Sequence, residues 1–276
     1  MEAFKSFEIK RFENEQWNTL DDTLSIEEAL QIRIEHTVGN IRKNEALSIT
    51  MRTPGDDFEL AAGLLYSEGI INDRDQIIDI NYCGEKSEGN QYHNTVTVNI
   101  EPSFTLDLEK SQRRFLSNSS CGICGKINHD QLITHSTLEN ENPWLTEQLV
   151  FKVIEQLKTD QIQFAHSGAN HAAALYNQKA ECEVLKEDIG RHNALDKLIG
   201  SLFLESAFAK KKILVLSGRN SYEMMSKAAI AKISVVLSIG APTSLAVDLA
   251  KLYNITLIGF IKKNKFNTYN GWERFV

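Results

Sequence analysis

The first part of the chain alternates apolar and polar residues, a pattern that predicts β-strands. Three segments place apolar side chains at every second position, namely residues 30–34, 47–51 and 96–100. A period of two with one polar face is typical of antiparallel strands that bury only one side. Asp56 and Glu59 have the spacing of a capping box that begins a helix, and Gly69 would end that helix. We therefore expect residues 1–115 to form a small α+β domain.

The hydrophobic pattern changes after Asp188, where short apolar runs alternate with amphipathic segments of about ten residues. The expected strands are residues 213–216, 233–237 and 255–260, and the expected helices are residues 193–208, 222–231 and 245–253. An amphipathic helix over 149–157 and a hairpin that turns at 177–179 precede them. Such alternation indicates parallel βαβ units with helices on both faces. We expect residues 116–276 to form a three-layer α/β domain that begins with a mobile CxxC loop.

Composition and charge exclude several classes of protein. Thirty Lys and Arg against 37 Asp and Glu give a formal net charge of -7. This is the wrong sign for binding nucleic acid or an anionic membrane by bulk attraction. The first twenty residues contain no apolar signal segment, and nowhere do eighteen uncharged apolar residues run together. We therefore expect a cytoplasmic protein that binds neither nucleic acid nor membrane.

The segment SSCGICGK, residues 119–126, is the strongest chemical signal, because Cys121 and Cys124 form a CxxC in a loop of glycine and serine. The neighbouring Lys126 would favour the thiolate, which is the nucleophilic form of cysteine. A structural zinc site needs four ligands, and the sequence offers no second CxxC to complete one. A thioredoxin-like dithiol would follow a strand directly. A carrier of sulfane sulfur as a persulfide fits the loop best, with zinc and dithiol chemistry as alternatives.

Two histidine segments add candidate binding residues. In EDIGRHNALDKLIG, residues 187–200, the carboxylates of Asp188 and Asp196 are spaced so that they could orient His192 on a helix. Arg191 supplies a planar fork suited to phosphate or a guanine edge. The alternative is a helix start with solvated charges. His171 lies at the mouth of an expected strand, in a segment that lacks the zinc-deaminase signature.

Polar groups also follow the three expected parallel strands. They are Ser217, Gly218 and Arg219 after the first, Thr243 and Ser244 after the second, and Phe260, Ile261, Lys262, Lys263, Asn264 and Lys265 after the third. Ligands of parallel sheets bind at the carboxyl ends of the strands, so this lining suits an anion with several phosphates. The alternative is that the three lysines only aid solubility.

Six segments taken in order resemble the FdhD family of formate dehydrogenase accessory sulfurtransferases. They are CGICGK, SGANHAAAL, EDIGRHNALDKLIG, SGRNSYEM, APTSLAVDLA and GFIKKNKFNTY, within residues 46–269. The resemblance implies a cytidine-deaminase-like domain without deaminase chemistry, a smaller α+β domain and a homodimer. It further implies sulfur transfer from a cysteine desulfurase to the molybdenum cofactor, a bis-molybdopterin guanine dinucleotide, before that cofactor enters the formate dehydrogenase apoenzyme.

The resemblance also implies residue roles. Cys121 would carry the persulfide, Cys124 would assist it, and residues 260–265 would contact the cofactor. GDP would mimic the nucleotide end of that cofactor, and no metal site is expected. The family usually has an arginine where this chain has Lys262 and Lys263, which keep the charge but lose the bidentate fork. A scaffold that binds the cofactor without moving sulfur is the rival interpretation.

Overall fold

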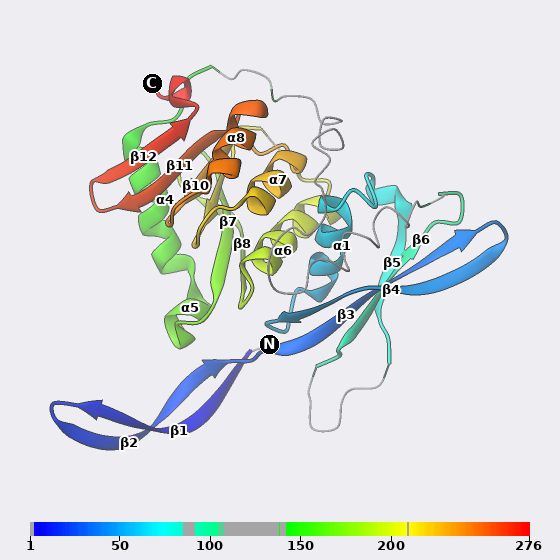
Figure 1. Ribbon diagram of the computed structural model, residues 1–276, viewed down its shortest axis with the longest axis horizontal. Helices are drawn as coiled ribbons and strands as arrows, with labels where there is room; N and C mark the ends of the chain where they lie inside the picture. Colours follow the sequence, from blue (N-terminus) through cyan, green and yellow to red (C-terminus); the bar gives the residue numbers. More distant parts are fainter. Residues whose placement is uncertain (1–2, 85–91, 105, 107–137, 139–141, 209) are drawn as a thin grey trace.

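The structure is a computed structural model that describes residues 3–84, 92–104, 106, 138, 142–208 and 210–276 (Figure 1). The predicted domain boundary near residue 115 lies outside these residues. The described strands form three sheets, with two, four and six strands.

The four-stranded sheet and one helix build the smaller unit. Its elements are β3 (Glu28–Val38), β4 (Ile41–Arg52), α1 (Asp57–Ser67), a 3₁₀ helix (Arg74–Gln76), β5 (Ile77–Tyr82) and β6 (Thr95–Ile100). The strand order is β4-β3-β6-β5, and every neighbouring pair is antiparallel except β3 and β6. Leu30, Ile32 and Ile34 are completely buried in a core shared with α1. The predicted α+β character of this part is confirmed.

Two sequence details of this unit were wrong. Leu47 is an extra residue in the pairing of β4 with β3, so the alternation flips there and Ile49 and Met51 face outward. Asp56 does not cap α1 with its side chain; its backbone is left-handed, with φ 54°, and its carboxylate accepts a hydrogen bond from Lys186 Nζ at 2.7 Å. Gly69 follows the helix with φ 69°, as a C-terminal glycine should.

A separate antiparallel ribbon, which the hydrophobic pattern did not predict, precedes the smaller unit. It consists of β1 (Phe4–Glu13) and β2 (Gln16–Ser25), paired along their full lengths. Asn14 and Glu15 make the two-residue turn with φ values of 52° and 63°. In Figure 1 this ribbon, which we call the arm, extends away from both larger sheets.

The six-stranded sheet forms the larger unit, in the order β12-β11-β10-β9-β7-β8. Its strands are β7 (His171–Tyr176), β8 (Cys182–Asp188), β9 (Ile213–Leu216), β10 (Val235–Ser238), β11 (Thr256–Lys262) and β12 (Lys265–Asn270). Its helices are α4 (Glu147–Asp160), α5 (Ile162–Ser167), α6 (Arg191–Leu204), α7 (Tyr222–Ile230), α8 (Ser244–Leu252) and a 3₁₀ helix (Trp272–Arg274). The pairs β9–β10 and β10–β11 are parallel, as predicted, whereas β7, β8 and β12 pair antiparallel with their neighbours.

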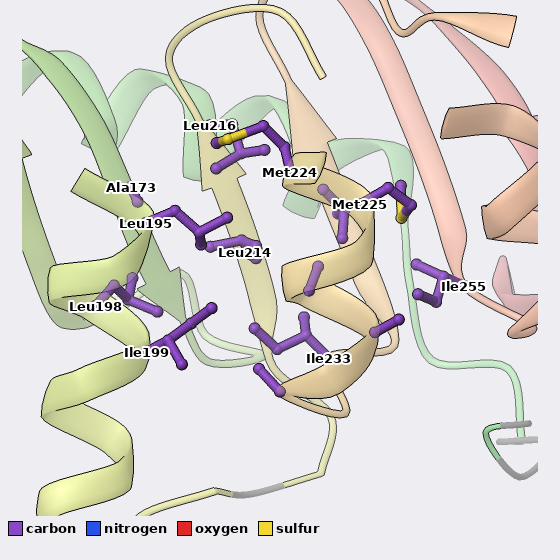
Figure 2. Close-up of a cluster of buried hydrophobic side chains, with 14 of the residues drawn as sticks. Ala173, Leu195, Leu198, Ile199, Leu214, Leu216, Met224, Met225, Ile233 and Ile255 are labelled. Carbon is purple, nitrogen blue, oxygen red and sulfur yellow. The ribbon is translucent and has the colours of Figure 1, made fainter. Parts of the chain in front are cut away.

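Alternate residues of the central strands enter two cores. Leu214 and Leu216 pack with α6, α7 and α8 on one face, part of which Figure 2 shows. Ile213 and Val215 pack on the other face against α4, which contributes Val150, Val153 and Leu157 among others. The mixed α/β, three-layer prediction is therefore supported, while the specific cytidine-deaminase-like arrangement stays a prediction.

The two units meet where α1 crosses α6 without intervening side chains. An ideal Cβ on Gly63 would lie 1.9 Å from the Asp196 carbonyl oxygen, and one on Gly200 would lie 1.8 Å from the Glu59 carbonyl oxygen. Only glycine permits this approach. Phe203 of α6 completes the junction, because it is buried in the core of the smaller unit.

Candidate functional site

The loops after β9, β10 and β11 lie side by side, as the sequence predicted for strand ends. Main-chain hydrogen bonds run from Gly240 N to Gly218 O at 3.1 Å and from Phe260 N to Gly240 O at 3.2 Å. Asn220 joins the first two loops twice, because its N–H donates to Ala241 O and its carbonyl accepts from Thr243 N. These bonds hold the three loops together as one surface, which we call the strand-end surface.

Glycine allows this close contact. An ideal Cβ on Gly240 would lie 3.0 Å from Gly218 O and 3.1 Å from the Arg219 Cα. One on Gly259 would lie 2.9 Å from Cδ of Pro242. Arg219, Thr243 and Ser244 are exposed on this surface. Thr243 Oγ1 also accepts a hydrogen bond from Ala246 N, so it is the predicted hydroxyl cap of α8.

The third loop differs from its predicted form, because the chain continues as a hairpin into β12. The turn places Lys262 opposite Lys265, with Asn264 in the left-handed region at φ 62°. Lys262, Lys263, Asn264 and Lys265 are all exposed at this hairpin. Ile261 instead packs its side chain into the core beside α4.

Phe260 has a strained backbone at the point where β11 leaves its neighbours. Its φ is 52°, and the pairing with β12 shifts register between Gly259 and Lys262. A left-handed aromatic residue is costly and persists where the surroundings hold it, often at a binding site. The residue is 45% exposed, so its aromatic side chain is accessible to solvent.

His171 lies against the first of these loops. Ala172 N donates to Ser217 Oγ at 2.8 Å, and an ideal Cβ on Gly218 would lie 3.3 Å from His171 Nδ1. Burial lowers the pKa of His171, and the nearby Arg191 and His192 lower it further, while Asp188 opposes them. The imidazole is therefore neutral near pH 7 and can accept a proton or a hydrogen bond.

Arg191 and His192 begin α6, which follows Gly190. His192 Nε2 lies 2.8 Å from Glu223 Oε2 of α7. The bond from His192 lowers the pKa of Glu223 below its usual range despite partial burial. The prediction that Asp188 and Asp196 orient His192 was wrong, because Asp188 ends β8, outside the helix, and Asp196 faces Lys227 and Ser67.

Asp188 has a different role, which the sequence did not reveal. Its Oδ1 accepts hydrogen bonds from Gly190 N at 2.8 Å and Asn193 Nδ2 at 3.1 Å. Its Oδ2 accepts one from Thr53 N at 3.1 Å and lies 2.7 Å from Lys197 Nζ. The carboxylate is fully buried and ties the end of β4 in the smaller unit to the start of α6.

A second buried group lies directly behind the strand-end surface. Asn220 is completely buried, and neither polar atom of its side chain has a hydrogen-bond partner among the residues that the structure describes. Buried amides are normally paired, so this one is a candidate for contact with a bound group after a local rearrangement. An orphaned amide leaves no trace in the sequence, so it could not be predicted.

Cys121 and Cys124, the predicted catalytic pair, lie outside the described residues, as does Lys126. The described cysteines are Cys83 and Cys182. Burial of its thiol and the nearby Asp160 raise the pKa of Cys182 to about 11. The role of the CxxC as the sulfur carrier therefore stays a prediction.

Comparison with known proteins gives the family directly. The model of the FdhD/NarQ family matches residues 26–276. The chain belongs to the FdhD/NarQ family. It is 39% identical to the sulfur carrier protein FdhD of Streptomyces avermitilis over 264 residues, 94% of this chain and 91% of the relative. It is 38% identical to the protein of the same name from Picrophilus torridus, with 93% of each chain covered.

The fold agrees with a solved structure. A crystal structure described as a formate dehydrogenase accessory protein from Desulfotalea psychrophila covers all of both chains with a TM-score of 0.74 at 21% identity. That likeness shows the fold. The arm precedes the residues that the FdhD/NarQ model matches.

Two further properties concern only the described part of the chain. It contains no cluster of three His, Cys, Asp or Glu side chains able to hold a metal ion. It also contains no helix long and apolar enough to cross a membrane.

Proposed function

We propose that this member of the FdhD/NarQ family carries sulfur as a persulfide on Cys121 and delivers it to the molybdenum cofactor for formate dehydrogenase. The observation that carries the proposal is the CxxC in a chain whose relatives are named sulfur carrier proteins over nearly their full lengths. The donor is a cysteine desulfurase, and the recipient is bis-molybdopterin guanine dinucleotide, which the protein passes to the apoenzyme.

The chemistry balances without a metal. The Cys121 thiolate attacks the outer sulfur of the desulfurase persulfide, which forms a new persulfide on Cys121 and releases the desulfurase thiolate. The sulfane sulfur keeps its oxidation state in this exchange. If the Cys124 thiolate then attacks the inner sulfur of Cys121, it releases hydrosulfide and leaves a disulfide, which a thiol reductant must reduce before the next cycle.

The strand-end surface supplies what a dinucleotide cofactor needs. The planar guanidinium groups of Arg191 and Arg219 suit phosphate oxygens, and the lysines of the β11–β12 hairpin add positive charge. Ser217, Thr243 and Ser244 offer hydroxyl groups, His171 lies against Gly218 of the same surface, and His192 lies near enough to His171 to lower its pKa. Phe260 offers an aromatic face on which a guanine ring can stack.

Mass spectrometry tests the transfer step. Incubation with a cysteine desulfurase and cysteine should add one sulfur atom to the peptide that contains Cys121. The addition should be absent in Cys121→Ser, whereas Cys124→Ser should load but fail to release. Unchanged formate dehydrogenase activity in cells that carry only Cys121→Ser would contradict the proposal.

Calorimetry with GDP tests the binding surface. Loss of one charge-assisted contact costs roughly 1.5 to 3 kcal/mol, which is about ten- to a hundredfold in Kd. Arg219→Ala and Lys262→Ala should each show such a loss, and added salt should weaken binding to the wild type. Lys179→Ala is the matched control. Lys179 is exposed in the turn after β7, at the opposite end of that strand from His171, which lies at the site. Equal affinities in all four proteins would place the ligand elsewhere.

The same experiments separate sulfur transfer from the rival scaffold function. A scaffold that carries Cys121→Ser would still bind GDP and would still support the client enzyme. A sulfur carrier with that substitution would still bind GDP but would fail to activate the enzyme.

A further inference from the structure

The arm is an isolated two-stranded ribbon with open edges. Within the described part of the chain its strands pair with each other and with no other strand, from Phe4 opposite Ser25 to Glu13 opposite Gln16. Apart from contacts near its base, such as that of β2 with α5, it extends away from the body (Figure 1). Trp17 is 69% exposed, and Phe7 and Phe12 are also exposed. Such ribbons are marginally stable alone, and ten-residue edges offer unpaired main-chain groups to another strand.

The charges distinguish the two edges. The charged residues of β2 are Asp21 and Asp22, so two β2 strands placed side by side would bring carboxylates together. β1 carries both signs, with Lys5, Lys10 and Arg11 against Glu8 and Glu13. Only β1 can therefore match its charges against its own copy.

One antiparallel register makes β1 complementary to itself. When Ile9 lies opposite the partner's Ile9, Glu8 lies opposite the partner's Lys10, and Lys5 lies opposite the partner's Glu13. The two-fold axis repeats each pair, so four opposite-charge pairs flank a central apolar contact. Within its own arm Glu8 lies opposite Asp21, a like-charge pair that the partner's Lys10 would offset.

We propose that the outer edge of β1 docks on the same edge of a second copy of this chain, in this register, to form a four-stranded sheet across a two-fold axis. Sheets of three or more strands are stable where a lone ribbon is marginal. The arrangement is closed, because both β1 edges are consumed, and the remaining β2 edges carry only negative charge. A homodimer is an expectation from the family resemblance; the structure assigns the surface and the register that would form it.

Charge reversal and its rescue test this register in the full-length protein, with the dimer Kd measured by analytical ultracentrifugation. Lys10→Glu places like charges at two symmetric positions, as does Glu8→Lys. We expect each single variant to weaken the dimer at least about tenfold, since both pairs turn repulsive. The double variant with both substitutions restores opposite charges and should return to within about threefold of the wild type.

The controls separate docking from folding of the arm. Glu8→Lys puts a lysine opposite Asp21 of its own arm, so it should stabilise the ribbon while it weakens the dimer. Lys179→Glu makes the same charge change as Lys10→Glu on a distant turn and should leave the dimer Kd unchanged. GDP affinity and persulfide loading should be retained in all these variants, so failure of the docking proposal is distinct from failure of the proposed function.

Three outcomes would overturn the docking proposal. The first is a monomeric wild type at micromolar concentrations. The second is a dimer whose Kd responds to Lys10→Glu no more than to Lys179→Glu, or whose double variant is as weak as the singles. The third is assembly that grows beyond the dimer with concentration, which would indicate pairing of β1 with β2 of the next copy.

Discussion

Replacement of Asp188 by Asn should destabilise the fold and shift the titration of His171. The carboxylate receives three hydrogen bonds and lies 2.7 Å from Lys197 Nζ, with no exposed surface. An asparagine keeps the shape but has one acceptor oxygen, and its NH₂ would face at least one of these donors. Lys197 would remain 1% exposed without its counter-charge.

The expected cost follows from the broken ion pair. Removal of one partner of a buried pair costs about 3 to 5 kcal/mol, because the other charge stays buried. Within the described residues Lys197 keeps one bond, to the Thr53 carbonyl oxygen at 2.8 Å, which favours the lower end, about 3 kcal/mol. Urea unfolding of the wild type and Asp188→Asn would measure this difference in the free energy of unfolding.

The effect on His171 distinguishes the site from general instability. Burial, Arg191 and His192 lower the pKa of His171, and the Asp188 charge raises it. Removal of that charge should lower the midpoint further, which NMR titration of the imidazole would show. Because the folded pKa lies below the unfolded one, His171 costs stability as pH falls through about 6.5, the pKa of an ordinary histidine.

Asp196→Asn is the matched control. Asp196 is also buried on α6 and lies 2.7 Å from the buried Lys227 of α7. Its loss should cost a similar free energy of unfolding, but Asp196 is not one of the charges that shift the pKa of His171. The same His171 midpoint in the wild type and Asp188→Asn, or equal shifts in the two variants, would refute the reasoning.

The central sheet was the most predictable part of the fold. Residues 213–216 form β9 at the predicted bounds, because a strand buried on both faces must be apolar at every position. The expected helix over 193–208 ends at Leu204, and Ser206 turns with φ 51°. The pattern shows which residues are buried, but it does not show where the backbone turns.

The arm and the Asp188 contacts could not be predicted in the same way. β1 and β2 have no continuous apolar face that would mark them as core, and their pairing depends on a turn at Asn14 and Glu15 without glycine. Asp188 contacts Thr53, which is 135 positions away in the chain. Local spacing suggested a link to His192 instead, because a helical periodicity was extended across Gly190, where the helix begins.

Two further predictions concern the junction and the described thiols. Gly63→Ala and Gly200→Ala should each lower the free energy of unfolding by about 3 kcal/mol or more, because each new Cβ would lie within 2 Å of a carbonyl oxygen. Thermal unfolding would measure this loss. A loss below about 0.5 kcal/mol would mean that α1 and α6 are less tightly packed than the structure shows. Cys182 should react slowly with iodoacetamide, although the residue is exposed, because burial of its thiol and Asp160 raise its pKa to about 11. At pH 8 only about one thiol in a thousand is then a thiolate, against about a quarter for a cysteine of pKa 8.5, so labelling should be roughly 200-fold slower and should rise steeply toward pH 11. Asp160→Asn should speed the reaction at pH 8, and rapid labelling of the wild-type Cys182 at that pH would contradict the assignment of a protonated thiol. Slow labelling would show that Cys182 is a poor nucleophile at pH 8 and therefore a slow acceptor of sulfur in the loading experiment.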